Sequence, residues 1–533
     1  MPNPFFYGDP VPMDLFLDRW RELRRITGRI TNRGQSTAII GEPRSGKTSL
    51  LLYLGSPEAR AQFYGAEGGR LLFSYLDAQT LGGRFSQAQF WEYALRPLYE
   101  QVIASDPDSP LARAYGTCQE NEFGAFVLER LFAQMVPTGW RLVLMLDEFD
   151  VLLYHPILNC AEFFGSLRSL ASRSQGALAL VVASRRSLAS LNRATQEFSR
   201  TGSPYFNFLY EITLGPLPYR AIAALLRRAE GRFTLDDCRF IRHVAGGHPY
   251  LLQVAAAEQW DAYSEGEDDP NRRWRQVGHR LYEEAGLTLG DTWQFWPPAM
   301  RCAFTTVALD HTSFLLGLHT QGPVPKENAS AHTDLIKLFE ILDKRFGEDD
   351  LQTLCFYLNV DYENLPVGGR ANKARELISY LRRRSRISDL LETGRKLRPD
   401  VAWEDTLEAD RNTNTRFPSI LPERSLIRDF DLELRSLDKQ GFVAEDATVP
   451  GGWRVRPQAF LWWIADELVR TTRDEIALAE WLHRQEMENL LTQGGKEQWA
   501  EAVRAVCGML RDGAKTLIEA AARGAAEVLA RGV

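Results

Sequence analysis

The segment Gly41–Thr48 has the residue types and spacing that bind phosphate. Its sequence, GEPRSGKT, fits the pattern GxxxxGK[ST] and stands between an apolar strand pattern and an apolar helical pattern, as that motif requires. The glycines let the backbone wrap so that N–H groups and the next helix N-terminus face the β- and γ-phosphates. Lys47 adds positive charge there, and the Thr48 hydroxyl is placed to ligate Mg²⁺. We therefore expect ATP or ADP with Mg²⁺, bound by Gly41, Glu42, Pro43, Arg44, Ser45, Gly46, Lys47, Thr48 and Ser49.

A second motif joins an apolar strand pattern to two carboxylates. Residues 142–146, LVLML, are followed directly by Asp147 and Glu148. We expect Asp147 to hold Mg²⁺ together with Thr48, and Glu148 to act as the catalytic residue that polarises the attacking water. The pair indicates a slow ATP hydrolase acting as a switch. We interpret the nearby Asp150 as a solvated or helix-capping acid.

Two further side chains are candidates for contact with a nucleotide. Arg185 follows the apolar run 179–183, at the sheet edge where open α/β proteins place ligands, and a cation there could sense the γ-phosphate. The alternative is an ordinary surface arginine. Tyr7 lies ahead of the phosphate-binding loop and either covers the adenine base or belongs to the core.

Short apolar runs alternate with helical patterns from residue 35 to about 217, which predicts an α/β P-loop NTPase fold. Several runs are apolar at successive positions, as in strands of a parallel sheet covered by helices on both faces. We expect residues 90–102 and 123–135 to be crossover helices. The expected strands are 36–40, 71–76, 142–146, 179–183 and 210–214.

Beyond residue 217 the pattern is mainly helical. A helix over 292–308 and a helix with a β-wing after residue 430 together suggest one winged helix, split by a small all-α death-like insert. Segments 322–325 and 399–422 are the expected linkers, rich in proline or in polar residues. The expected domains are an NTPase domain at 1–217, a helical lid at 218–288, the winged helix at 289–321 and 425–472, the insert at 331–400, and C-terminal helices at 473–533.

Composition excludes several classes of protein. The net charge of -7 argues against broad attraction to nucleic acid or to anionic membranes. The six cysteines contain no CxxC pair, so we expect reduced thiols. The N-terminus has no basic and apolar targeting pattern, and no run of about 18 apolar residues occurs. We therefore expect a cytoplasmic chain with no membrane contact in its resting state.

Positions 3 to about 285 resemble the STAND class of AAA-like ATPases, the signalling relatives of the nucleotide-binding immune receptors of animals and plants. The segments that carry the resemblance are NPF at 3–5, VP at 11–12, GEPRSGKT at 41–48, LDEF at 146–149, YEITLGPL at 210–217 and GGHPYLLQ at 246–253. The resemblance implies that a GxP motif, here Gly247, His248 and Pro249, closes over the nucleotide with its proline on adenine. His248 is then either a phosphate sensor or a helix cap or core residue.

Residues 331–400 resemble a bacterial effector-associated domain, a helical adaptor of conflict systems. The resemblance is carried by DLIKLFEIL at 334–342, FGEDDLQTLCFYLNVDYENLP at 346–366 and KARELISYLRRR at 373–384. It implies recruitment of a separate effector protein with a matching domain. The position inside a winged helix departs from the usual terminal placement and leaves the accessibility of the insert open.

The two halves of the insert carry opposite charge. Acids concentrate in the first half, at 334, 340, 343, 348, 349, 350, 361 and 363, and bases in the second, at 370, 373, 375, 382, 383, 384, 386, 395, 396 and 398. A bipolar module can stack head to tail into rings or filaments. The alternative is that helix packing mixes the two runs into one solvated surface. Nucleic-acid contact by 382–386 is disfavoured because no aromatic residues are interleaved there for base stacking.

The leading hypothesis is an ATP/ADP-dependent switch in bacterial antiviral defence or programmed cell death, which oligomerises and recruits an effector. The alternative is a DNA-associated AAA+ ATPase of the origin-binding type that uses the winged helix. Its candidate recognition segment, 427–441, is charge-balanced, whereas phosphate contacts normally need a cationic face. The balanced charge of this segment therefore argues against nucleic acid as a partner. A third reading is an ATPase scaffold with one fixed partner.

Overall fold

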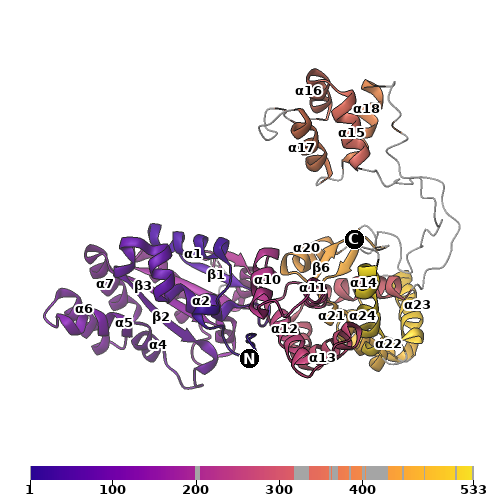
Figure 1. Cartoon of the computed structure of the whole chain (residues 1–533). Coiled ribbons are helices and arrows are strands. Elements are labelled where there is room, and N and C mark those ends of the chain that lie inside the picture. Colours follow the sequence, from indigo (N-terminus) through magenta and orange to yellow (C-terminus); the bar gives the residue numbers. More distant parts are fainter. Residues whose placement is uncertain are drawn as a thin grey trace. The chain divides into compact units, whose positions relative to one another are not determined.

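The computed structural model shows two compact units (Figure 1). The first unit comprises residues 1–319 and 419–533, and the second comprises residues 320–418. Within these units the structure describes residues 2–198, 204–316, 335–358, 360, 362, 370–382, 386–398, 403, 430–446, 449, 451–472, 474–491, 493–510 and 513–530. The two expected linkers, 322–325 and 399–422, therefore lie almost entirely outside the described residues.

A parallel sheet forms the core of the N-terminal half, with the strand order β2-β3-β4-β1-β5. The strands are β1 (Thr37–Ile40), β2 (Leu71–Asp77), β3 (Arg141–Asp147), β4 (Leu178–Ser184) and β5 (Tyr210–Thr213). Strand β4 lies between β1 and β3, with Thr37 opposite Val181 and Leu142 opposite Leu178. This arrangement brings the carboxyl ends of β1, β3 and β4 together at one sheet edge. The predicted parallel sheet and its strands are confirmed.

Helices cover both faces of this sheet, as predicted. Because strand side chains alternate, Ile39 and Val143 pack with α1 and α2 on one face, whereas Ala38 and Leu144 pack with helices α4 to α9 on the other. The helices are α1 (Trp20–Arg33), α2 (Lys47–Gly55), α3 (Pro57–Ala59), α4 (Gln87–Ala94), α5 (Arg96–Gln101), α6 (Pro110–Glu120), α7 (Ala125–Met135), α8 (Ala161–Arg173) and α9 (Leu188–Ala194).

Two of the predicted helix spans are corrected in this region. The helix expected over 90–102 is divided between α4 and α5 at Leu95, since Pro97 at the start of α5 lacks the N–H that would continue the α4 ladder. The helix expected over 123–135 begins at Ala125. Phe123 instead has a left-handed backbone with φ of 55°.

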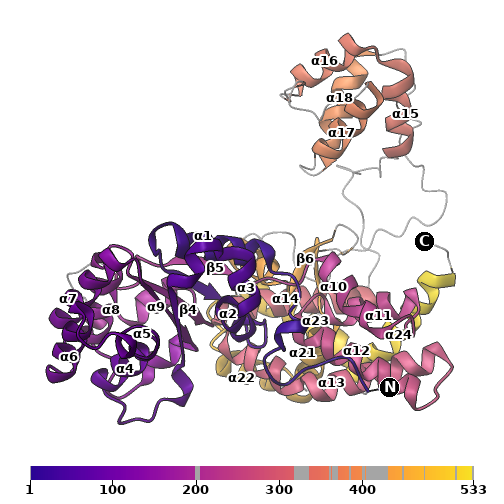
Figure 2. The same cartoon turned by 60° about the vertical axis from the view of Figure 1, so that its left-hand side comes forward.

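A helical body follows the sheet. Its helices are α10 (Tyr219–Leu226), α11 (Leu235–Ala245), α12 (Pro249–Ser264) and α13 (Pro270–Phe295). Helices α11, α12 and α13 gather with α21 and α24 from the C-terminal part of the chain (Figure 2). Helix α13 runs past residue 288, where we expected a domain boundary, so it links the expected lid to the elements that follow.

A buried carboxylate holds α11, α12 and α13 together. Asp237 has no exposed surface, and Oδ1 accepts hydrogen bonds from Gln259 Nε2 at 2.7 Å and Trp274 Nε1 at 2.8 Å. Its other oxygen accepts from Tyr263 OH at 2.6 Å, and Arg273 Nη2 lies 3.4 Å from Oδ1. Burial alone would raise the Asp237 pKa, but these hydrogen bonds outweigh it and the pKa is lowered.

The helix expected over 292–308 is wrong. Residues 292–295 end α13, and α14 (Pro298–Leu315) begins after Trp296 and Pro297. Two consecutive prolines cause the break, because proline lacks an N–H and restricts the residue before it to extended backbone. Trp296 accordingly has ψ of 141°. The junction therefore places one aromatic side chain, Trp296, between two long helices.

Helix α14 packs against elements that return more than a hundred residues later in the chain. These are α20 (Asp431–Gln440) and an antiparallel hairpin of β6 (Val443–Glu445) and β7 (Trp453–Val455). Next come α21 (Gln458–Thr471), α22 (Glu475–Arg484), α23 (Gln493–Met509) and α24 (Ala514–Ala530). Val503, Val506 and Leu517 are buried against the same core, so the C-terminal helices pack on the first unit. No helix in the described part of the chain is long and apolar enough to cross a membrane.

The second unit has its own hydrophobic core, formed by helices α15 (Leu335–Arg345), α16 (Glu348–Tyr357), α17 (Arg370–Arg382) and α18 (Ile387–Leu397). Helix α15 packs on α17, and α16 packs on α18, so helices of the acidic half meet helices of the basic half. Arg398 Nη1 lies 3.7 Å from Asp350 Oδ2, and this ion pair joins the two halves. Residues 334, 361, 363, 383 and 384 of the expected charge pattern lie outside the described residues.

We expect Asp237→Ala to lower the free energy of unfolding of the first unit by about 3–5 kcal/mol, because the buried Arg273 would lose the carboxylate that lies 3.4 Å from its Nη2. The measurement is the urea unfolding midpoint followed by tryptophan fluorescence. Asp236→Ala is the matched control, since Asp236 makes an exposed ion pair with Arg239 and should cost at most about 1 kcal/mol. Equal losses in both variants would contradict the role of Asp237.

Candidate nucleotide-binding site

The phosphate-binding loop connects β1 to α2. Gly46 has φ of 93°, and an added Cβ would meet no atom within 4 Å, so the glycine serves backbone conformation and leaves open space beside the loop. Lys47 begins α2 and is buried, and its Nζ donates to Gly41 O at 2.9 Å and Glu42 O at 3.1 Å. Burial lowers the Lys47 pKa, and nearby Glu148 opposes that effect. The loop and its lysine thus have the predicted local context.

Arg19 holds this loop in place through backbone carbonyls, and the sequence did not reveal this role. It is buried, donating from Nη2 to Ser45 O at 3.2 Å and from Nη1 to Gly215 O at 2.9 Å. One guanidinium thereby connects the loop to the segment that leads into the helical body. No motif marks this arginine, because its partners are backbone carbonyls distant in the sequence.

The two predicted carboxylates stand at the end of β3. Asp147 is buried, with Oδ2 accepting from Tyr75 OH at 3.1 Å and Oδ1 accepting from Glu148 N at 2.9 Å. Glu148 has a left-handed backbone with φ of 46°, and its Oε2 lies 3.2 Å from Arg185 Nε. Burial raises the Glu148 pKa, while Lys47 and Arg185 lower it. The expected catalytic carboxylate is therefore engaged in an ion pair in this arrangement.

Arg185 follows β4 at the same edge, as predicted. The interpretation of Asp150 as a solvated or capping acid is wrong, because its side chain is buried and Oδ1 accepts from Arg185 N at 3.1 Å. The guanidinium of Arg185 lies 6.0 Å from the Phe295 ring centroid at the end of α13. Asp150 thus positions the arginine between Glu148 and the helical body.

A cavity of about 590 Å³ opens beside the loop. Its walls include the predicted residues Tyr7, Pro43, Arg44, Ser45, Gly46, Lys47, Thr48, Ser49, Glu148, Arg185 and Pro249. The N-terminal segment is held there because Phe6 N donates to Gln253 Oε1 at 3.2 Å, and the Tyr7 ring meets Tyr250 edge-on at 6.2 Å. Side chains of α13, including Thr288 and Asp291, close the opposite wall.

Four of the predicted site residues do not line this cavity: Gly41, Glu42, Asp147 and His248. His248 is half-buried near the Pro43 backbone, with its ring 6.3 Å from that of Phe442. Burial lowers its pKa to about 4, and Arg19, Lys47 and Arg44 contribute. The sensor, cap and core roles considered for His248 stay predictions.

Glu42, in the phosphate-binding loop, also has a buried carboxyl group, and the loop motif does not account for its burial. The residue is 6% exposed, and within the described part of the chain its Oε2 has no hydrogen-bond partner. Burial raises the Glu42 pKa to about 7, against the effects of the Trp296 indole, Lys47 and Arg185. The α13–α14 junction therefore acts electrostatically on the phosphate-binding loop.

The groups around the cavity fit a nucleoside phosphate with Mg²⁺. Helix α2 presents its N-terminus to the loop, and the cavity has the size of small-molecule sites. Lys47, Arg44 and Arg185 would supply positive charge. The Thr48 hydroxyl and the Asp147 carboxylate are oxygen donors of the kind Mg²⁺ takes alongside phosphate and water, so no larger cluster of protein ligands is needed.

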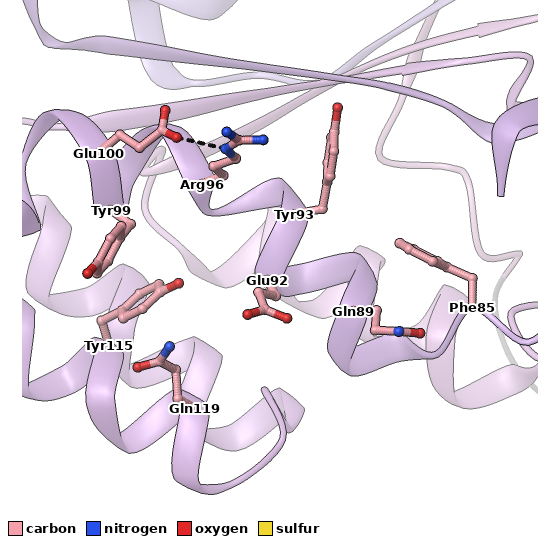
Figure 3. Close-up of a pocket in the computed structure, with 9 residues that line it drawn as sticks. All are labelled: Phe85, Gln89, Glu92, Tyr93, Arg96, Tyr99, Glu100, Tyr115 and Gln119. Carbon is pink, nitrogen blue, oxygen red and sulfur yellow. Dashed lines mark hydrogen bonds and ion pairs between the residues drawn. The ribbon is translucent and has the colours of Figure 1, made fainter. Parts of the chain in front are cut away.

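A second hollow, of about 530 Å³, lies on α4, α5 and α6 (Figure 3). It is lined by Phe85, Gln89, Glu92, Tyr93, Arg96, Tyr99, Glu100, Tyr115 and Gln119. Arg96 pairs with Glu100 at 2.7 Å, but both side chains are more than half exposed. The charged residues that line this second hollow are all exposed, whereas the cavity at the phosphate-binding loop borders the buried Lys47. The cavity at the phosphate-binding loop is therefore the candidate site.

Comparison with known proteins identifies one segment of the chain. Residues 335–399 match the family model of effector-associated domain 7, within the span where we predicted such a domain. No curated protein matches the sequence.

Similar solved structures include the Walker-type ATPase PABY2304 of Pyrococcus abyssi. It is 12% identical, the match covers 86% of this chain and 99% of that chain, and the TM-score is 0.43. The ORC2 protein of Aeropyrum pernix is similar at 14% identity, 86% and 93% coverage and a TM-score of 0.37. Domain III of the replication initiation protein DnaA of Thermotoga maritima follows at 13% identity, 51% and 99% coverage and a TM-score of 0.30.

We expect Lys47→Ala to weaken binding of Mg-ATP and Mg-ADP by about 10- to 100-fold, because it removes a buried charged donor from the loop. Isothermal titration calorimetry on the full chain measures this effect. Lys515→Ala is the control, since that lysine is exposed on α24, and it should bind as the wild type does. Unchanged affinity in Lys47→Ala would contradict the site assignment.

The raised pKa of Glu42 predicts a pH dependence of stability. The folded state binds this proton more tightly than the unfolded chain, so the free energy of unfolding should fall as pH rises from about 4.5 to about 7. Glu42→Gln removes this contribution, and its stability relative to wild type should rise by up to about 3 kcal/mol between pH 4.5 and pH 8. Urea unfolding at several pH values measures the difference. Glu120→Gln, an exposed change, should show no such trend.

Proposed function

We propose that this chain is an ATP/ADP-dependent switch of the STAND class in bacterial antiviral defence or programmed cell death. Nucleotide state controls self-association, and the effector-associated domain then recruits a separate effector protein. The observation that carries the proposal is the combination, in one chain, of a nucleotide site covered by helical elements and a segment that matches effector-associated domain 7.

Contacts between the site and the elements flanking the insert support this proposal. Gly246, beside the GxP motif, has φ of 60°, and an added Cβ would lie 2.6 Å from Pro457 N. Gly441, after α20, would likewise meet Pro216 at 2.8 Å. The residue after α20 therefore packs closely on the Pro216 ring, and the end of α11 packs closely on the backbone before α21. A change at the nucleotide site can reach α14 and α20, which are the two points of attachment of the effector-associated segment.

The ion pair between Arg185 and Glu148 supports slow hydrolysis in the closed arrangement. A general base has to accept a proton from water, and the Glu148 carboxylate has to leave its 3.2 Å ion pair with Arg185 before it can contact the attacking water. A bound γ-phosphate would compete for Arg185 and release Glu148, so hydrolysis has to wait for that exchange of partners.

The energetic requirement of such a switch is modest. Moving closed and open populations from 1:99 to 99:1 requires ATP to bind the open state about 5.5 kcal/mol more tightly than the closed state. Contacts between subunits of an assembly can supply part of this difference, since they form only in the open state.

The alternative, a DNA-associated ATPase of the origin-binding type, receives less support from the hairpin. The two arginines of the expected wing have acidic partners: Arg454 Nε lies 3.1 Å from Asp446 and Arg456 Nη2 lies 3.4 Å from Asp438. Phosphate binding would require these ion pairs to break. Salt-dependent binding of duplex DNA by the full chain would favour this alternative over the switch.

We expect the full chain to be monomeric with Mg-ADP and to form a larger assembly with Mg²⁺ and a non-hydrolysable ATP analogue. Light scattering on a sizing column measures the mass in each state. Lys47→Ala should stay monomeric in both, and Lys515→Ala should assemble normally. A monomer in every nucleotide state would contradict nucleotide-gated assembly and favour the fixed-partner scaffold.

A further inference from the structure

Several buried polar atoms beside the phosphate-binding loop have no hydrogen-bond partner among the residues that the structure describes. They are Glu42 Oε2, Ser45 Oγ, His248 Nδ1 and Trp296 Nε1. They come from the loop itself, from the turn before α12 and from the α13–α14 junction. Buried polar atoms are normally paired, so this grouping marks a place where the closed arrangement is held at a cost.

Glu42 is the charged member of this group. The Trp296 indole has the largest effect in favour of the ionised Glu42 carboxylate, followed by Lys47 and then Arg185. These are also the two cations best placed for the terminal phosphate of a nucleotide, as the loop lysine and the arginine at the end of β4. The Glu42 carboxylate and a γ-phosphate would therefore depend on the same positive charges.

A diphosphate and a triphosphate place different charge near this carboxylate. With a diphosphate, Lys47 and Arg185 remain available to offset the buried charge of Glu42. A γ-phosphate engages both cations and adds a like charge in a region of low dielectric, where repulsion acts strongly. Glu42 is 6% exposed and cannot reach water to relieve that repulsion while its surroundings stay in place.

Trp296 is the neighbour with the largest effect on the charge of Glu42. It is 2% exposed, and its ring centroid lies 5.0 Å from that of Phe442 and 5.1 Å from that of Phe460. Its neighbour Phe295 meets Arg185. Displacing Glu42 thus requires movement of the junction between α13 and α14, together with the hairpin and α21 that pack on it.

We infer that Glu42 is a specificity-determining residue that makes the closed arrangement favour a nucleoside diphosphate over a triphosphate. The buried Glu42 carboxylate competes with the γ-phosphate for Lys47 and Arg185, and the packing of Trp296 keeps the Glu42 side chain from moving away. Triphosphate binding is consequently coupled to displacement of Trp296 and opening of the α13–α14 junction. This inference deepens the proposed nucleotide switch and rests on it.

The test compares the affinities of the full chain for Mg-ADP and for a Mg-bound non-hydrolysable ATP analogue by calorimetry at pH 8. Glu42→Gln keeps the shape of the side chain without its charge, and the ratio of ATP-analogue to ADP affinity should rise about tenfold. Trp296→Phe keeps an aromatic ring but loses the indole N–H and should move the ratio in the same direction. Glu120→Gln should retain the wild-type ratio. Light scattering should show Glu42→Gln assembling at a lower analogue concentration than wild type.

An unchanged affinity ratio in Glu42→Gln overturns this inference while leaving the switch intact. If that variant does not fold, the ratio in Trp296→Phe decides by the same criterion. Absence of nucleotide binding in the wild type overturns both the switch and the role of Glu42. A raised affinity ratio in Glu42→Gln, together with wild-type assembly in Glu120→Gln, supports the inference.

Discussion

Charge buried around one backbone turn is the constraint on which this structure depends. Lys47 lies at the start of α2 with almost no solvent contact, and loop carbonyls hold its ammonium group. Arg19 and Glu42 are buried beside it. Each such group has to be compensated by protein atoms, because desolvation of an isolated charge is expensive. Trp296, at the end of the helical body, supplies part of that compensation for Glu42, so the packing of the helical body is linked to the charge of the phosphate-binding loop.

The parts of the molecule that follow local rules could be predicted from the sequence. Apolar runs located the strands, and the loop motif located Lys47 and Thr48 beside a cavity. The burial of Asp150 and the bracing role of Arg19 could not be predicted, since both depend on backbone atoms brought close only by folding. The break before α14 was predictable, because Pro297 and Pro298 forbid a continuous helix and were overlooked.

The route from the nucleotide site to the insert is short. The same junction that covers Glu42 begins α14, and the last residues of α14 lead into the segment that contains the effector-associated domain. On the return side, α20 ends at Gly441, which packs against Pro216. Both attachment points therefore belong to elements that contact the nucleotide-binding half. A rearrangement at this junction would therefore shift the elements that precede and follow the insert along the chain.

The split of this core also sets the order of events during synthesis. Helix α14 is buried on nearly every side, yet α20, α21 and β7, which cover it, all lie beyond the insert. At ordinary translation rates the ribosome needs on the order of ten seconds to make the intervening residues. During that interval α14 presents apolar surface to the cell while the insert, with its own core, can already fold. The nascent chain thus passes through a stage in which protection by a chaperone would matter most.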